Sequence, residues 1–347
     1  MPVQAKVPDP PIRARCGGLW PAAHRLHLWS LITVRSHALL SHFLDHYARH
    51  GVRLRSNAHI ILHEDFAPGA ATAMAAAQLA LAAHGVEDVQ VIRSSDSRRL
   101  EVSKIEKLNS AITRLPQDAL LIYADGDEFF TYPCNALARL TAAAQRSRSP
   151  PRNGVAICCF MQDRLASDYK RGALPLVSST ASPLEQQFPL CARLRGLQGR
   201  RVAAGARGWK PIPGNPMKLT LVRAWAAGRV AAFTSAHRVE YTHANKSTWR
   251  AGGFPGSGRE NCVLDPGRFS HFSMTREAVG LAQRKLADGE MTDTYNGTMR
   301  MFTPCAKRRA AGSETGCLTF RRDVHSLIRD RQANCTPMCT VCEPGVL

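Results

Sequence analysis

One apolar run, residues 119–124, and the acidic residues that follow it constrain the fold more than any other part of the chain. The run ends abruptly in Asp125, Gly126, Asp127 and Glu128. Apolar runs of this length, bounded by turn residues, are typical of buried strands. Three carboxylates at the end of a buried strand are costly without a counter-charge. The sequence therefore predicts that a cation meets these side chains at the carboxyl end of a central strand.

A divalent cation with oxygen ligands is the simplest counter-charge, and Gly126 leaves room for a second ligand such as a phosphate oxygen. Open α/β sheets bind ligands at this end of their strands. The alternative is a solvated acidic turn. Phe129 and Phe130 resume the apolar pattern at once, and the rest of the chain is basic. We therefore interpret Asp125-Gly-Asp127 as a metal–diphosphate site.

The charge balance points to an anionic partner. The 347 residues include 46 Lys and Arg against 27 Asp and Glu, which gives a formal net charge of +19. Nucleic acid, an anionic membrane surface and a nucleotide-sugar diphosphate would all fit. The arginines are dispersed, and no basic stripe alternates with aromatic residues as single-strand binding requires. This pattern favours a small anionic substrate over nucleic acid.

The cysteine pattern predicts an oxidising compartment. The chain has 11 cysteines, and three Asn-x-Ser/Thr sequons point the same way. The C-terminal cysteines are Cys305, Cys317, Cys335, Cys339 and Cys342, and the sequons begin at Asn245, Asn296 and Asn334. We expect disulfides or free thiols there rather than zinc, since a fourth ligand at finger spacing is missing. No stretch is apolar enough to span a bilayer, and the N-terminus lacks a signal-peptide core. The chain is expected to be soluble, or to lack an upstream anchor.

Strands and helices alternate in the first half of the chain, which predicts a parallel sheet covered by helices on both faces. The expected strands are 28–34, 58–63, 86–92 and 119–124, and the expected helices run from Ser36 towards Gly51, over 70–83 and from Ser97. His37, His42, His46 and His50 are expected on the solvated side of the first helix.

The second half is expected to be richer in loops. A helix over 134–145 precedes a buried strand over 154–161, from whose end Gln162, Asp163 and Arg164 emerge. Residues 166–216 are rich in Gly, Pro and Arg, which favours a long binding loop. Strand character resumes over 217–222, two histidines (His237 and His271) lie at predicted strand ends, and a helix is expected over 275–288.

Several short motifs, taken together, resemble a known family over about residues 28–288. They are Leu40…His42-Phe-Leu-Asp-His-Tyr47…Gly51-Val52, Tyr123–Phe130, Phe160–Arg164, Gln187-Phe-Pro189, Lys218 and His271-Phe272. This set is similar to glycosyltransferase family 92 and its GT-A-fold relatives related to family 2. The acidic motif is the specific part of the match.

The resemblance implies an α/β fold of the GT-A-like, Rossmann-like nucleotide-diphospho-sugar transferase type, with a mostly parallel central sheet flanked by helices. It implies a metal-dependent glycosyltransferase with Mn²⁺ or Mg²⁺ as cofactor. Asp125 and Asp127 resemble the family's DxD motif, which binds the metal that bridges the donor phosphates. His271 resembles a C-terminal histidine that completes the metal shell. His237 is its rival, and either histidine could instead be structural.

Two further residues carry open alternatives. If the reaction inverts the anomeric carbon it needs a catalytic base. Asp163 is the candidate for that base, with an ion pair to Arg164 as its structural alternative. Lys218 could contact a donor phosphate or be solvated.

The expected organisation has three parts. Residues 1–27 form a disordered or loosely packed segment, and 291–347 form a Cys-rich tail. Residues 28–290 form the transferase domain, with a nucleotide-sugar-binding half (28–145) and an acceptor half (146–290).

The expected reaction moves a hexose, by resemblance from a UDP-sugar, to a glycan or glycoprotein acceptor, without nucleic acid as a partner. The expected compartment is the Golgi or another secretory lumen, or the cytoplasm if the chain is complete. Membrane association is expected only through an anchor upstream of this chain.

Other functions remain open from the sequence. Phosphohydrolases of the haloacid-dehalogenase type also place Asp-x-Asp after a strand, but near the start of the domain, whereas three strand–helix units precede it here. A basic nucleic-acid-binding module is the non-enzymatic alternative, and its binding would fall steeply with salt and ignore Mn²⁺. An inactive transferase-like protein is the third.

Overall fold

The computed structural model describes about half of the chain, in several separate ranges. These are residues 25–66, 68–132, 156–167, 176–178, 183–192, 217–226, 229–235, 238–242, 248–252, 263–272, 275, 279, 302–304 and 318–320. Within these residues, no helix is long and apolar enough to cross a membrane.

The first half alternates strands with helices, as predicted. Its strands are β1 (Leu26–Thr33), β2 (Ala58–Glu64), β3 (Asp88–Arg93), β4 (Leu120–Tyr123) and β5 (Glu128–Phe130). Its helices are the 3-10 turn η3 (Val34–Ser36), α2 (His37–Arg49), α3 (Leu54–Asn57), α4 (Ala70–Ala83) and α5 (Ser97–Thr113). The four predicted strands are confirmed, each with bounds that differ by at most two residues. The short strand β5 was not predicted.

The second half contributes further strands. They are β6 (Ala156–Leu165), β7 (Leu190–Ala192), β8 (Met217–Arg223), β9 (Trp225–Ala226), β10 (Arg229–Val230), β11 (Ala232–Ser235), β12 (Arg238–Thr242), β13 (Thr248–Gly252), β14 (Val263–His271), β15 (Phe302–Pro304) and β16 (Leu318–Phe320), with one short helix, α7 (Leu184–Gln187). The predicted strand at 217–222 is confirmed, and the one at 154–161 extends to Leu165. The predicted helix at 134–145 lies outside the described residues, and so does the one at 275–288 except for Thr275 and Val279. Residues 1–24, the three sequons and the C-terminal cysteines also lie outside the described residues.

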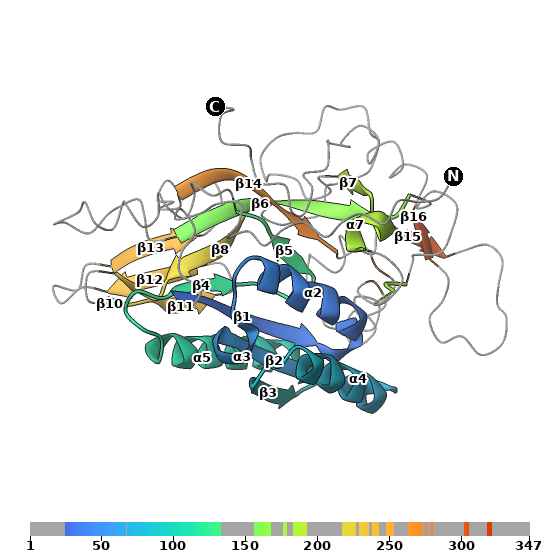
Figure 1. Cartoon of the computed structure of the whole chain (residues 1–347), viewed down its shortest axis with the longest axis horizontal. Coiled ribbons are helices and arrows are strands. Elements are labelled where there is room, and N and C mark those ends of the chain that lie inside the picture. The colour runs from blue at the N-terminus through green and yellow to red at the C-terminus, as the bar shows by residue number, and fades with distance from the viewer. Residues whose placement is uncertain are drawn as a thin grey trace.

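One large sheet joins the two halves. Its strand order is β3-β2-β1-β4-β8-β6-β14-β5, with β7 paired to β6. Strands β3, β2, β1, β4, β6 and β14 run in one direction, and β8, β7 and β5 run in the other. Of the eight strand pairings in this sheet, four are parallel and four are antiparallel. The chain is therefore a mixed α/β protein whose sheet is parallel from β3 to β4 and mixed beyond, so the expected mostly parallel sheet is confirmed only for the first half. Figure 1 shows this sheet, with α2, α4 and α5 beside the strands of the first half.

Helices cover both faces of this sheet because successive side chains of a buried strand point to opposite sides. On one face, Leu28 and Ile32 of β1 belong to the cluster formed by α2 and α4. On the other, Trp29 and Leu31 join the cluster formed by Leu108 and its neighbours on α5. Strands β1, β2 and β4 are thus buried on both sides, which explains their largely apolar sequences, whereas the edge strand β3 is partly exposed.

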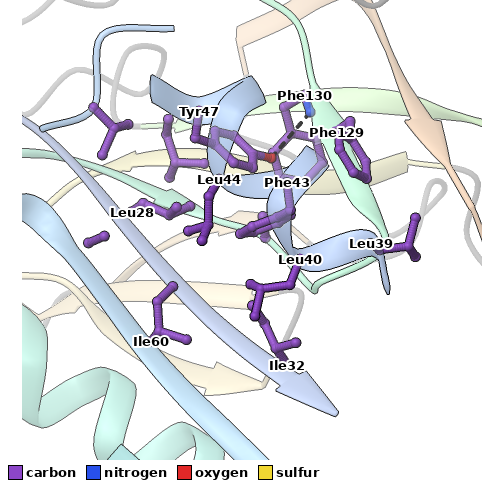
Figure 2. Packing of buried hydrophobic residues seen from close by; sticks show 14 of the residues in the cluster. Leu28, Ile32, Leu39, Leu40, Phe43, Leu44, Tyr47, Ile60, Phe129 and Phe130 are labelled. Atoms are coloured by element: carbon purple, nitrogen blue, oxygen red, sulfur yellow. Dashed lines mark hydrogen bonds between the residues drawn. The ribbon is translucent and has the colours of Figure 1, made fainter. Parts of the chain in front are cut away.

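Helix α2 packs its predicted apolar stripe against the sheet and against β5. Phe43, Leu44 and Tyr47 are fully buried, and Figure 2 shows them above β1 beside Phe129 and Phe130. The Tyr47 hydroxyl donates to the Glu128 carbonyl at 3.0 Å and accepts from the Phe130 amide at 3.2 Å. Helix α2 therefore fixes the strand that follows the acidic motif.

The expectation that the α2 histidines are solvated is wrong for two of the four. His46 is fully buried and His50 is 2% exposed. The ring of His46 bonds the Phe130 carbonyl through Nε2 at 2.8 Å and packs on Phe129. Because β5 covers this side of α2, the helix is buried over a wider arc than its own sequence indicates.

We expect the His46→Gln variant to lose less stability in acid than the wild-type chain. Burial, with the nearby His50 and Arg49, holds the pKa of His46 well below its usual value, although the bond to Phe130 opposes this. Below about pH 6.5 this histidine binds a proton in the unfolded chain but not in the folded chain. The free energy of unfolding therefore decreases as the pH is lowered. Between about pH 7.5 and 5.5 this histidine should account for about 1 kcal/mol, measured by urea unfolding at each pH.

A core variant that does not titrate is the control for this measurement. Phe43→Leu on the same helix should cost the same free energy at both pH values, since neither side chain binds a proton. An acid-induced loss in His46→Gln equal to that of the wild-type chain would contradict the prediction.

Candidate functional site

The acidic motif lies where the order of the strands reverses. The chain passes from β1 outward through β2 and β3, and then returns to place β4 on the other side of β1. In open α/β sheets, ligands bind outside the carboxyl ends of the strands at such a point. Asp125 follows the end of β4, where the Ala124 amide donates to the Trp29 carbonyl of β1 at 3.2 Å. The motif thus occupies the ligand-binding position of this sheet type.

A tight turn folds the motif on itself. The Glu128 amide donates to the Asp125 carbonyl at 3.0 Å, and the Asp125 amide donates to the Glu128 carboxylate at 3.0 Å. A Cβ on Gly126 would lie 3.1 Å from Cγ1 of Ile32, closer than ordinary van der Waals contact. Glycine at this position is therefore explained by packing against β1, a reason that the sequence did not reveal.

Two lysines bind the Asp125 carboxylate. Nζ of Lys104, from α5, lies 2.8 Å from Oδ1, and Nζ of Lys218, from β8, lies 2.7 Å from Oδ2. Lys218 also binds Oε2 of Glu128 at 2.5 Å. Both ammonium groups lie over the ring of Tyr123, at 5.3 and 5.1 Å from its centroid. This lysine–carboxylate cluster joins α5, β8 and the acidic turn.

The cluster shifts the pKa of each member. Burial opposes ionisation of Asp125, but Lys104 and Lys218 outweigh it and hold the pKa of this carboxyl far below its usual range. Burial likewise disfavours the charged lysines, yet Asp125 raises the pKa of both, helped by Glu128 at Lys218. For Glu128 burial dominates and raises the pKa, with Lys218 as the main opposing influence.

The structure excludes one of the two interpretations of Lys218 and adds Lys104 to the site. Lys218 is 2% exposed, so its interpretation as a solvated lysine is wrong. Contact with a donor phosphate is still a prediction. Lys104 was not predicted at all, although a signal existed: it lies four residues before Leu108, on the buried stripe of α5.

The second half of the motif faces a histidine. Nε2 of His271 lies 3.4 Å from Oδ2 of Asp127, and Nδ1 of the same ring lies 2.8 Å from Oδ1 of Asp163. Strand β14 holds His271 opposite Asp163 of β6 on one side and opposite Glu128 of β5 on the other. The Phe272 amide donates to the Asp127 carbonyl at 2.9 Å. The structure therefore brings together Asp127 and His271, two of the predicted metal ligands, and metal binding by them is still a prediction.

The sequence predicted that Asp163 emerges from the end of its strand, and this prediction is wrong. It lies inside β6, which continues to Leu165, and its neighbours in the sheet are β14 and β7 rather than β4. Its side chain is 1% exposed, under the ring of His271. Arg164, the next residue, donates from Nε to Ser270 Oγ at 2.9 Å. Two charged residues continue the strand because strand β14, more than 100 residues later in the chain, supplies their partners.

Three of these side chains could hold a cation. Asp127, Glu128 and His271 each offer a ligand atom, and these atoms lie within 4.8 Å of one another. Neighbouring ligands of an octahedral Mg²⁺, each at about 2.1 Å, are about 3 Å apart. The 3.4 Å between Nε2 of His271 and Oδ2 of Asp127 is close to that separation. His237, the other predicted histidine, lies outside the described residues.

Charge and proton placement also fit a cation. Four carboxylates (Asp125, Asp127, Glu128 and Asp163) face two ammonium groups (Lys104 and Lys218), which leaves two negative charges if all ionise and His271 is neutral. An ionised Asp163 can only accept, so Nδ1 of His271 carries a proton. The lone pair of a neutral His271 would then face an Asp127 oxygen with no proton between them. Either a second proton or a metal ion resolves this contact.

Comparison with protein-family models and with curated proteins finds no match to this chain.

Proposed function

We propose that this chain is a metal-dependent glycosyltransferase of GT-A architecture. The observation that carries the proposal is the convergence of Asp127, Glu128 and His271 near the strand reversal of a mixed α/β sheet. A nucleotide diphosphate bound there would lie outside the carboxyl ends of β1 and β4. Its negative charge would be matched by a divalent cation, as the resemblance to family 92 implies.

The residues have distinct parts in this proposal. Asp127 and His271 would hold Mn²⁺ or Mg²⁺, with Glu128 beside them. The metal would neutralise charge that develops on the departing nucleotide diphosphate. Lys104 and Lys218 would keep Asp125 ionised and in place, and Asp125 is proposed as a further contact to the metal or donor. The transferred group is a hexose, from a UDP-sugar by resemblance, and the acceptor a glycan or glycoprotein of a secretory compartment.

A thermal-shift screen with the purified chain tests this function. UDP, GDP and their hexose derivatives are added with Mn²⁺, with Mg²⁺ or with EDTA. A ligand that binds the folded state at 100 times its Kd stabilises it by about 2.7 kcal/mol. We expect a higher unfolding midpoint that requires both a nucleotide diphosphate and the metal.

The same screen separates the proposal from its alternatives. Midpoints unaffected by any nucleotide sugar, with or without metal, would contradict the transferase. Binding to oligonucleotides that weakens steeply with salt would favour the basic nucleic-acid-binding protein instead.

A further inference from the structure

We propose that Asp163 is a positioning residue that fixes the tautomer and ring orientation of His271, so that Nε2 of this histidine is directed at the metal. The proposal rests on the proposed function, since it assigns a role to a residue of that same site. It replaces the interpretation of Asp163 as the catalytic base with one in which the carboxylate acts through His271.

Backbone register sets this arrangement. Parallel pairing of β6 with β14 places Asp163 opposite His271, and antiparallel pairing of β14 with β5 places His271 opposite Glu128. Side chains at paired positions lie on the same face of a sheet. The imidazole ring is thus held between a carboxylate on one side and the acidic turn on the other, by the hydrogen-bond ladder of three strands.

Proton placement follows from the contact at Nδ1. The ring atom lies 2.8 Å from Oδ1 of Asp163, and both side chains are buried, at 6% and 1% exposure. A carboxylate accepts hydrogen bonds, so it stabilises the tautomer with the proton on Nδ1 and leaves the lone pair on Nε2. Nε2 is the atom that faces Asp127. A carboxylate behind a metal-binding histidine orients the ring and makes its free nitrogen more basic.

Burial separates this role from that of a general base. A base must come within about 3 Å of the acceptor proton that it removes, directly or through one water. Asp163 is 1% exposed and turns Oδ1 towards His271, whereas Asp127 is 28% exposed. An acceptor sugar reaching the site would therefore meet Asp127 and His271 before Asp163.

The test compares Asp163→Asn with Ser270→Ala. Asparagine keeps the size of the side chain but removes the charge that selects the tautomer. Ser270 lies next to His271 in β14 and, pointing to the opposite face, binds Arg164 of β6. Ser270→Ala thus removes a buried hydrogen bond between the same two strands without touching the histidine. Both full-length variants are assayed for Mn²⁺ affinity by electron paramagnetic resonance and for stability by urea unfolding.

Asp163→Asn should weaken Mn²⁺ binding by about 10- to 100-fold, whereas Ser270→Ala should leave the Mn²⁺ Kd unchanged. The substrate for the activity assay is the UDP-sugar that raises the unfolding midpoint most. The rate at which Asp163→Asn releases UDP from it should recover at saturating Mn²⁺. Without metal, and at a pH high enough to deprotonate the His271 imidazolium, nitrogen NMR of His271 should show the Nδ1–H form in the wild-type chain and a mixture of tautomers in Asp163→Asn.

Three results would overturn the proposal. A large loss of turnover that saturating Mn²⁺ does not restore, with an unchanged Mn²⁺ Kd, would make Asp163 the base. Loss of stability alone, as in Ser270→Ala, would make its role structural. An unchanged tautomer in the metal-free variant would show that Asp163 does not select it.

Absence of Mn²⁺ binding by the wild-type chain would instead contradict the proposed function. The tautomer measurement would still decide what Asp163 does to His271.

Discussion

Replacement of Lys218 by methionine should lower the free energy of unfolding by about 3–5 kcal/mol, the usual cost of removing one partner from a buried ion pair. The Lys218 ammonium is 2% exposed and binds carboxylates of both Asp125 and Glu128. Methionine fills a similar volume but leaves Glu128, which is 4% exposed, as a buried charge without this partner. Urea unfolding near pH 7 measures the loss.

Lys107, a lysine of helix α5 outside the buried cluster, provides a matched control. Lys107 of α5 is half-buried and donates to the neutral side chain of Gln90 at 2.9 Å. Lys107→Met removes the same charge but strands no carboxylate, so it should cost about 1 kcal/mol or less. Adding Glu128→Gln to Lys218→Met should restore part of the lost stability, because the amide needs no counter-charge. Equal losses for Lys218→Met and Lys107→Met would contradict the buried cluster.

The first half of the fold could be predicted because its signals are local. Apolar runs mark the strands, and the helix over 70–83 has the predicted bounds, beginning after Gly69 and ending before Gly85, both in the left-handed region. The strands β6 and β14 show where local reasoning stops. Asp163 and Arg164 look like the end of a strand because charged residues seldom continue a buried one. Their partners His271 and Ser270 follow more than 100 residues later.

The same limit applies to the site. Asp127 and His271 were linked in advance only through the resemblance to family 92, which left His237 as an equal rival for the same role. The two lysines around Asp125 could not be assigned to it from the sequence. Lys104 and Lys218 look like ordinary helix and strand residues, and only the folded chain brings them to the carboxylate. Glu128 was noted in the acidic turn, but only the structure gives it a partner in Lys218.

Asp127→Asn should weaken Mn²⁺ binding by more than about 100-fold, beyond the effect expected for a residue that only supports a ligand. Its carboxyl is half-buried beside Nε2 of His271. Burial opposes ionisation, but a protonated His271 outweighs it and lowers the pKa of Asp127 in the metal-free chain. A bound cation would take the place of that second proton on Nε2. The amide keeps the shape and removes the charge. Calorimetric titration with Mn²⁺, followed by turnover of the selected UDP-sugar, measures both consequences.

Asp125→Asn is the companion variant, and it should show the opposite balance of effects. Both carboxylate oxygens of Asp125 bind lysines, so its amide leaves Lys104 and Lys218 less well compensated in a buried site. We expect a loss of about 3 kcal/mol in unfolding free energy and a smaller loss of Mn²⁺ affinity than in Asp127→Asn. Equal losses of Mn²⁺ affinity, with stability unchanged in both, would mean that the two aspartates share the metal and that the lysines release Asp125 when it binds.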